Sequence, residues 1–90
     1  MTSDNKLKKK PGLVEYEIDD ELAIYDPDLN KVHILNRTAS AVWGLIEEGT
    51  PTEEIVSLMA KAYGLDLASA KKDVMEVIRR FSDAGLVLST

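Results

Sequence analysis

The pattern of hydrophobic and polar residues changes about a third of the way along the chain. In the first part, apolar and acidic residues alternate, as in Val14, Tyr16 and Ile18 against Glu15 and Glu17. Alternation with a period of two is typical of a strand that has one face in water, here the acidic face. In the second part, apolar residues recur every three or four positions, which is typical of helices that bury one face. The sequence therefore predicts a sheet followed by helices.

Three short strands are predicted at residues 12–19, 22–25 and 31–35. The segments between them, 19–21 and 26–30, are rich in Asp and Asn and contain Pro27, which is typical of tight turns. Short connections between sequential strands predict an antiparallel meander. Strand 31–35 is then an edge strand whose outer backbone groups are unpaired.

Three helices are predicted at about 38–48, 51–63 and 66–84, and the segment 86–88 is expected to be a short final strand. Gly49, Gly64 and Gly85 follow the three helices as stop signals. The second helix is expected to start with a capping box, in which the Thr50 hydroxyl caps and Pro51 takes the first helical position. Asp66 is expected to cap the third helix, whose apolar stripe runs through Leu67, Ala70, Val74, Val77, Ile78 and Phe81.

The only tryptophan is predicted to lie at the centre of the core. Ala39, Val42, Trp43 and Ile46 are spaced i, i+3, i+4, i+7 and so share one face of the first helix. A buried indole requires an acceptor for its N–H group. The chain has 90 residues, enough for one small domain.

The fold class predicted is α+β and winged helix-turn-helix-like: a three-stranded antiparallel sheet, three helices and a short C-terminal strand. Residues 1–11 contain four lysines and almost no apolar side chains, so they are expected to be a disordered tail. Residues 12–88 are expected to form the single domain.

Composition excludes several kinds of chemistry. The chain has no cysteine, so disulfides, thiolate metal sites and a cysteine nucleophile are ruled out. His33 is the only histidine, and nothing nearby in the sequence completes a metal site with it. Neither a phosphate-binding glycine loop nor a catalytic constellation is apparent. We therefore expect a binding module without cofactor, and not an enzyme.

The same sequence indicates where such a module acts. No apolar run is long enough to span a membrane, and the N-terminus lacks the apolar core of a secretory signal, so a cytoplasmic protein is expected. The net charge of −5 disfavours nucleic acid as a partner.

Two surfaces are candidates for binding. The first is the edge strand, Lys31, Val32, His33, Ile34 and Leu35. The second is a flank of the third helix, where a helical projection groups Lys71, Met75 and Arg79 with Lys72 beyond them; Asp73, Arg80 and Ala84 lie on the other flank. These surfaces suit a domain that adds a peptide strand to its sheet, a winged-helix DNA-binding regulator, or a subunit that dimerises through the strand edge.

The run Val32-His33-Ile34-Leu35-Asn36-Arg37-Thr38-Ala39-Ser40-Ala41-Val42-Trp43 resembles the strand-to-helix signature of PqqD-like proteins. The spacing to Gly49-Thr50, Glu54-Ile55, Tyr63-Gly64, Asp73-Val74 and Ala84-Gly85-Leu86-Val87 is similar as well, so the resemblance covers nearly all of residues 12–88. The namesake of this family is a peptide chaperone in pyrroloquinoline quinone (PQQ) biosynthesis that presents a precursor peptide to a radical S-adenosylmethionine (radical SAM) enzyme. The wider family is the RiPP recognition element, which binds the leader segment of a ribosomally made precursor as an added strand.

The resemblance implies a non-enzymatic chaperone whose partners are a precursor peptide and a peptide-modifying enzyme of the radical SAM type. The leader would pair with residues 31–35 and contact Lys71, Lys72, Met75 and Arg79, and the protein would be a monomer or a weak dimer. An acidic or amphipathic leader would suit the cationic flank. The run is more similar to the broad PqqD-like set than to the quinone-pathway protein, which leaves both that pathway and another modified peptide open. A winged-helix transcriptional regulator is the alternative function.

Overall fold

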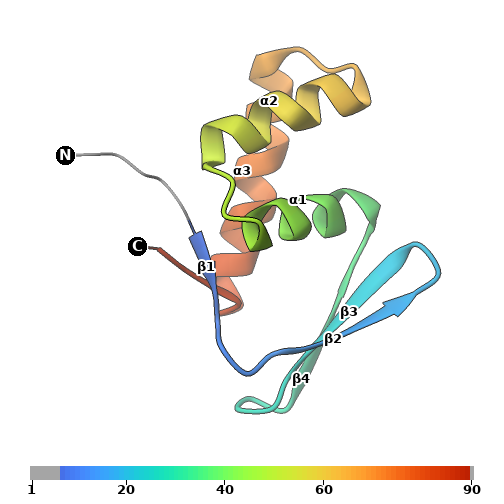
Figure 1. Cartoon of the computed structure of the whole chain (residues 1–90), viewed down its shortest axis with the longest axis vertical. Helices are drawn as coiled ribbons and strands as arrows, with labels where there is room; N and C mark the ends of the chain where they lie inside the picture. Colours follow the sequence, from blue (N-terminus) through green and yellow to red (C-terminus); the bar gives the residue numbers. More distant parts are fainter. Residues whose placement is uncertain (1–6, 90) are drawn as a thin grey trace.

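The computed structural model describes residues 7–89 and contains the predicted α+β architecture. Three strands form an antiparallel meander in the order β2-β3-β4, and three helices pack together above one face of it (Figure 1). A second, two-stranded sheet pairs β1 with β5. The elements are β1 (Leu7–Lys9), β2 (Val14–Ile18), β3 (Glu21–Asp26), β4 (Lys31–Leu35), α1 (Arg37–Glu47), α2 (Thr52–Tyr63), α3 (Leu67–Asp83) and β5 (Val87–Ser89).

Only one face of the meander is covered by helices. Residues directly opposite each other in an antiparallel pair share a face, so Glu15, Ile24 and His33 lie on one side of the sheet. Ile24 is buried on that side, next to the helices. Tyr16 lies on the other side with Ile34, and both are more than half exposed, at 55% and 58%.

The faces of β2 are therefore the reverse of those predicted. Glu15 lies on the helix side because its Oε2 accepts the indole N–H of Trp43 at 3.1 Å. A buried indole needs this acceptor, and that requirement determines which face of the short strand is turned inward. The apolar residues Val14, Tyr16 and Ile18 face away and are exposed.

Side-chain caps begin two of the three helices: Asp66, as predicted, and Asn36, one of the two polar residues, Asn36 and Thr38, that the sequence offers as a cap for the first helix. The side chain of Asn36 accepts from the amide of Ala39 at 2.9 Å, and that of Asp66 accepts from Ser69 at 2.7 Å. The start of α2 differs from the prediction, because the N-cap residue is Pro51 and the helix begins one residue later than expected. Leu67, which is predicted in the apolar stripe of α3, is instead 62% exposed at the first position of the helix.

Trp43 is the centre of the core, as predicted, with 1% of its surface exposed. The Phe81 ring from α3 meets it edge-on, with centroids 5.2 Å apart and an interplanar angle of 79°. The Lys9 ammonium lies 5.0 Å from the centroid of the Trp43 ring and forms ion pairs with Glu15 and Glu47. Trp43 thus connects α3 and β1 to α1.

Residues 7–11 are ordered, which corrects the prediction of a tail over residues 1–11; residues 1–6 lie outside the described part of the chain. Leu7–Lys9 pairs antiparallel with Val87–Ser89, and Lys10 N donates to the carbonyl of Leu86 at 2.8 Å. A three-residue strand with two lysines has too little apolar pattern to be recognised, and its partner lies at the far end of the sequence.

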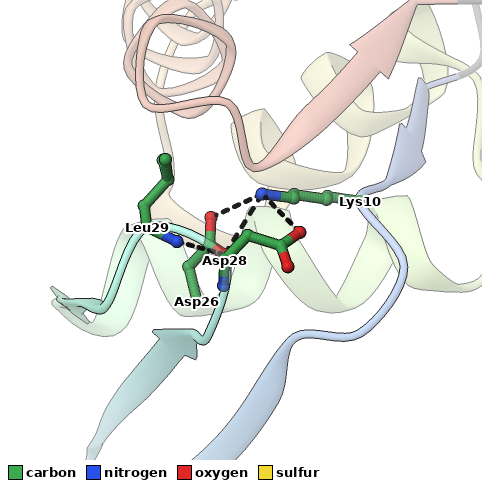
Figure 2. Close-up of polar contacts among 4 residues, drawn as sticks. All are labelled: Lys10, Asp26, Asp28 and Leu29. Carbon is green, nitrogen blue, oxygen red and sulfur yellow. Dashed lines mark hydrogen bonds and ion pairs between the residues drawn. The ribbon is translucent and has the colours of Figure 1, made fainter.

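Lys10 also fixes the turn between β3 and β4 (Figure 2). Its Nζ lies 2.9 Å from Asp26 Oδ2 and 3.3 Å from Asp28 Oδ2. Asp26 is fully buried, and its Oδ1 accepts from the amides of Asp28 and Leu29 at 3.0 and 3.4 Å. The hydrogen bond from Lys10, followed by those backbone amides, holds the pKa of Asp26 below its ordinary value of 3.8 despite burial.

Candidate functional site

A groove with a volume of about 550 Å³ separates β4 from α3. Within the described chain, β4 has a strand neighbour, β3, on one side only, so the backbone groups on its other side border this groove. The groove is lined by Val32, His33, Ile34, Leu35, Asn36, Thr38, Ala39, Asp73, Glu76, Val77, Arg80, Phe81, Ala84 and Leu86.

The floor of the groove is apolar and rigidly supported. Leu35, Phe81 and Leu86 are buried, and Val77 and Ala84 are half-buried beside them. Because the Phe81 ring forms a T-shaped contact with Trp43, the floor is part of the central core. Such a floor can accept apolar side chains without rearrangement.

The rim on α3 is charged with both signs. Asp73, Glu76 and Arg80 are exposed, and the guanidinium of Arg80 lies 3.7 Å from the Glu76 carboxylate. An exposed ion pair of this kind contributes about 0–1 kcal/mol, so both groups are available to a ligand at little cost.

His33 is the other notable group in the groove. Its Nε2 is buried, and within residues 7–89 no group forms a hydrogen bond with it. A buried polar atom without a partner costs about 1–3 kcal/mol. A ligand in the groove can supply the missing partner.

The structure brings together only part of the predicted site. Val32, His33, Ile34 and Leu35 line the groove, and Lys31 precedes them at the start of β4. On α3, however, Lys72, Met75 and Arg79 line another hollow of about 610 Å³, which meets the groove only at Glu76 and Arg80. Lys71 is not among the groove residues.

The flank of α3 that faces β4 is the one with Asp73, Arg80 and Ala84. In a helical projection these residues lie opposite the cationic flank, but the helical period alone does not tell which flank faces the sheet. Val77 borders this flank, and an apolar residue there indicates that this flank, and not the cationic one, faces other parts of the protein.

The described residues give no sign of a metal centre or a membrane segment. Among residues 7–89, no group of three or more His, Cys, Asp or Glu side chains is placed to hold a metal ion. No helix in the same part of the chain is long and apolar enough to cross a bilayer.

Comparison with protein families identifies the chain. The model of the family described as coenzyme PQQ synthesis protein D (PqqD) matches residues 21–87, which include β3, β4 and all three helices. The chain belongs to the PqqD family. No curated protein matches it.

Two solved structures are similar to this PqqD-family chain. The structure of TbiB1 in complex with the TbiA(beta) leader peptide has 28% sequence identity and a TM-score of 0.83, covering 89% of this chain and 93% of that one. The structure of a lasso peptide synthetase B1 complexed with the leader peptide has 16% identity and a TM-score of 0.85, covering 92% of this chain and 98% of that one. The second likeness confirms the fold.

Proposed function

We propose that this protein binds the leader segment of a ribosomally made precursor peptide in the groove between β4 and α3. The observation that carries the proposal is an unpaired edge strand beside an apolar floor, in a family member similar to TbiB1, which was solved with a leader peptide. The leader adds a fourth strand to the meander and hydrogen-bonds to the free backbone groups of β4.

The shape of the groove determines which leader residues contribute. In an added strand, alternate side chains point to the same face, so every second residue of the leader lies over Leu35, Val77 and Phe81. These residues of the leader should be apolar. The residues between them point to the outer side of the sheet and are less constrained.

The rim modifies the charge expected of the leader. Asp73 and Glu76 offer two carboxylates and Arg80 one guanidinium, so the groove favours a leader with at least one basic residue near the α3 side. The acidic leader expected from Lys71 and Arg79 suits the other flank of α3, which does not border β4.

The protein then presents the bound precursor to a peptide-modifying enzyme, of the radical SAM type that the family resemblance implies. The domain has no catalytic step of its own in this scheme, and we expect it to act in the cytoplasm, where precursors are translated. The modified product is PQQ or another ribosomal peptide.

A titration followed by backbone-amide NMR tests the proposal. The probes are two synthetic peptides: a candidate leader taken from a short open reading frame that neighbours the gene, and the TbiA(beta) leader. We expect shift changes in residues 31–36 and in the α3 flank around Asp73, Val77 and Arg80. Shifts around Lys72, Met75 and Arg79 instead would move the site to the other flank.

Backbone methylation of the peptide makes the test specific for strand addition. An N-methyl group removes one amide donor without touching the protein, so alternate positions of the leader should lose affinity about tenfold while the intervening ones are unaffected. Uniform tolerance of N-methylation, or absence of binding by both leaders, would contradict the proposal.

A further inference from the structure

A hollow formed by α1, α2 and α3 continues the groove at the end marked by Thr38 and Asp73. It has a volume of about 360 Å³ and is lined by Thr38, Met59, Tyr63, Leu65, Ala70, Asp73 and Val74. Thr38 and Asp73 also line the groove between β4 and α3, so the two spaces meet at these residues. Figure 1 shows α2 ending and α3 beginning at the top of the molecule, above α1.

The lining of this hollow is almost wholly apolar. Met59, Ala70 and Val74 are buried and form its floor, whereas Tyr63 and Leu65 are 42% and 38% exposed at its rim. The polar residues in the lining, Thr38 and Asp73, stand where it joins the groove. A cavity of about 150 Å³ is enough to hold benzene, so this hollow has room for a large apolar side chain.

We propose that the hollow is a second subsite for the leader peptide and takes one large aliphatic or aromatic side chain. This inference rests on the proposed function, because the occupant is the flank of the leader that leaves the groove between Thr38 and Asp73. Continuity of the two spaces and the apolar lining select that occupant.

The direction of β4 identifies which flank this is. The chain runs from Lys31 to Leu35 and then to Thr38, toward the hollow. Both neighbouring pairs in the meander are antiparallel, and an added strand that continues this pattern runs back from Thr38 toward Lys31. The N-terminal flank of the leader therefore lies at the hollow, a few residues before the strand-paired segment.

A double-mutant cycle between protein and peptide tests this subsite. The protein variants are Leu65→Lys and, as a matched control, Leu58→Lys, which lies on α2 with 39% exposure and does not line the hollow. The peptides are the two synthetic leaders with and without their N-terminal flank. Affinities are measured by calorimetry, and thermal unfolding confirms that each variant is folded.

We expect Leu65→Lys to weaken binding of the full leader about tenfold, the loss for one poorly buried apolar side chain. Removal of the N-terminal flank should weaken leader binding to wild type by a similar factor. It should not weaken binding to Leu65→Lys any further, because both changes remove the same contact. Leu58→Lys should behave as wild type with both peptides.

Two results would overturn the inference while leaving the proposed function intact. One is a full leader that shifts the amides of residues 31–36 but binds Leu65→Lys and wild type equally. The other is that Leu65→Lys alters how the size of the protein depends on concentration but leaves leader affinity unchanged. The hollow would then be a contact between copies of the chain. Failure of both leaders to bind wild type would overturn the proposed function as well.

Discussion

At the level of a single residue, the unpaired Nε2 of His33 is expected to lower stability and to favour leader binding. Because this buried atom has no partner within residues 7–89, replacing the ring by an apolar side chain removes an unsatisfied group. We predict that His33→Leu raises the free energy of unfolding by about 1 kcal/mol, measured by urea denaturation, and weakens leader binding about tenfold.

Lys31→Leu is the control for this prediction. It makes a polar residue of the same strand apolar but lies outside the lining of the groove. It should leave leader affinity within a factor of about two. Equal leader affinity in His33→Leu and wild type would show that the peptide does not use this nitrogen.

The buried Asp26 carboxylate makes stability depend on pH. Its pKa is lower in the folded protein than its ordinary value of 3.8, chiefly through the hydrogen bond from Lys10. A lowered pKa contributes stability that is present above 3.8 and is lost as the pH falls through the folded value. We predict that Asp26→Asn is less stable than wild type at neutral pH and loses less stability between neutral and acid pH.

Urea unfolding at a series of pH values measures this effect. Asp66→Asn is the matched control, because the pKa of Asp66 is also lowered, mainly by the amide of Ser69, but asparagine still caps a helix. Asp66→Asn should be nearly as stable as wild type at neutral pH. Its free energy of unfolding should depend on pH only slightly less than that of wild type in the acid range. If the free energy of unfolding of Asp26→Asn fell with acid pH as steeply as that of wild type, another carboxylate would dominate acid unfolding.

Individual contacts divide into those that a sequence reveals and those that it does not. The caps at Asn36 and Asp66 are local, since donor and acceptor lie three residues apart, and both could be predicted. The acceptor of Trp43 could not, because Glu15 lies 28 positions away and reads as one more acidic residue of a solvent-exposed face. The Lys10–Asp26 pair is hidden in the same way.

At the level of elements, β1 is held by the contacts of Lys9 as well as by its pairing with β5. Its ammonium lies over Trp43 and between Glu15 and Glu47, whereas the neighbouring Lys8 is exposed. A cation–π contact at a partly exposed site is worth about 0.5–1 kcal/mol. We predict that Lys9→Gln lowers the free energy of unfolding by about 1 kcal/mol, or the midpoint of thermal unfolding by about 4–8 °C.

Lys8→Gln controls for the loss of one positive charge in the same strand and should change the midpoint by less than about 2 °C. Leader affinity should be the same in both variants, since β1 does not line the groove. Equal destabilisation by the two variants would mean that net charge, and not the contact with Trp43, explains the effect.

The limits of element prediction follow from distance along the chain. Strand β4 was placed at its observed bounds, because an alternating run between a turn and a helix cap is a local signal. Strand β1 was missed, because it is a strand only through its pairing with Val87–Ser89. The flank of α3 that borders β4 is likewise decided by packing in the whole molecule, so the sequence alone does not distinguish the flank with Asp73 and Arg80 from the one with Lys71, Lys72, Met75 and Arg79.

Charge across the whole molecule distinguishes a leader-binding domain from a winged-helix regulator. The chain carries a net charge of −5, and Lys9 and Lys10 are engaged in ion pairs with carboxylates. On α3, the hollow that contains Lys72 and Arg79 also contains Glu76 and Asp83. The positive charges of the described chain thus do not form the continuous basic face that a DNA reader presents to phosphates.

We therefore predict that the protein binds a leader peptide with little dependence on salt and does not bind duplex DNA. Fluorescence anisotropy with a labelled leader and a labelled duplex, between about 50 and 200 mM salt, measures both. Leader affinity should change by less than about threefold, because the rim of the groove carries both signs. A protein that contacts 6–10 phosphates would lose roughly 10³–10⁵ in affinity over that range. The regulator would be favoured if the protein bound the duplex at micromolar concentration, lost affinity this steeply with salt, and did not bind the leader. In that case α3 would be the helix that enters the major groove.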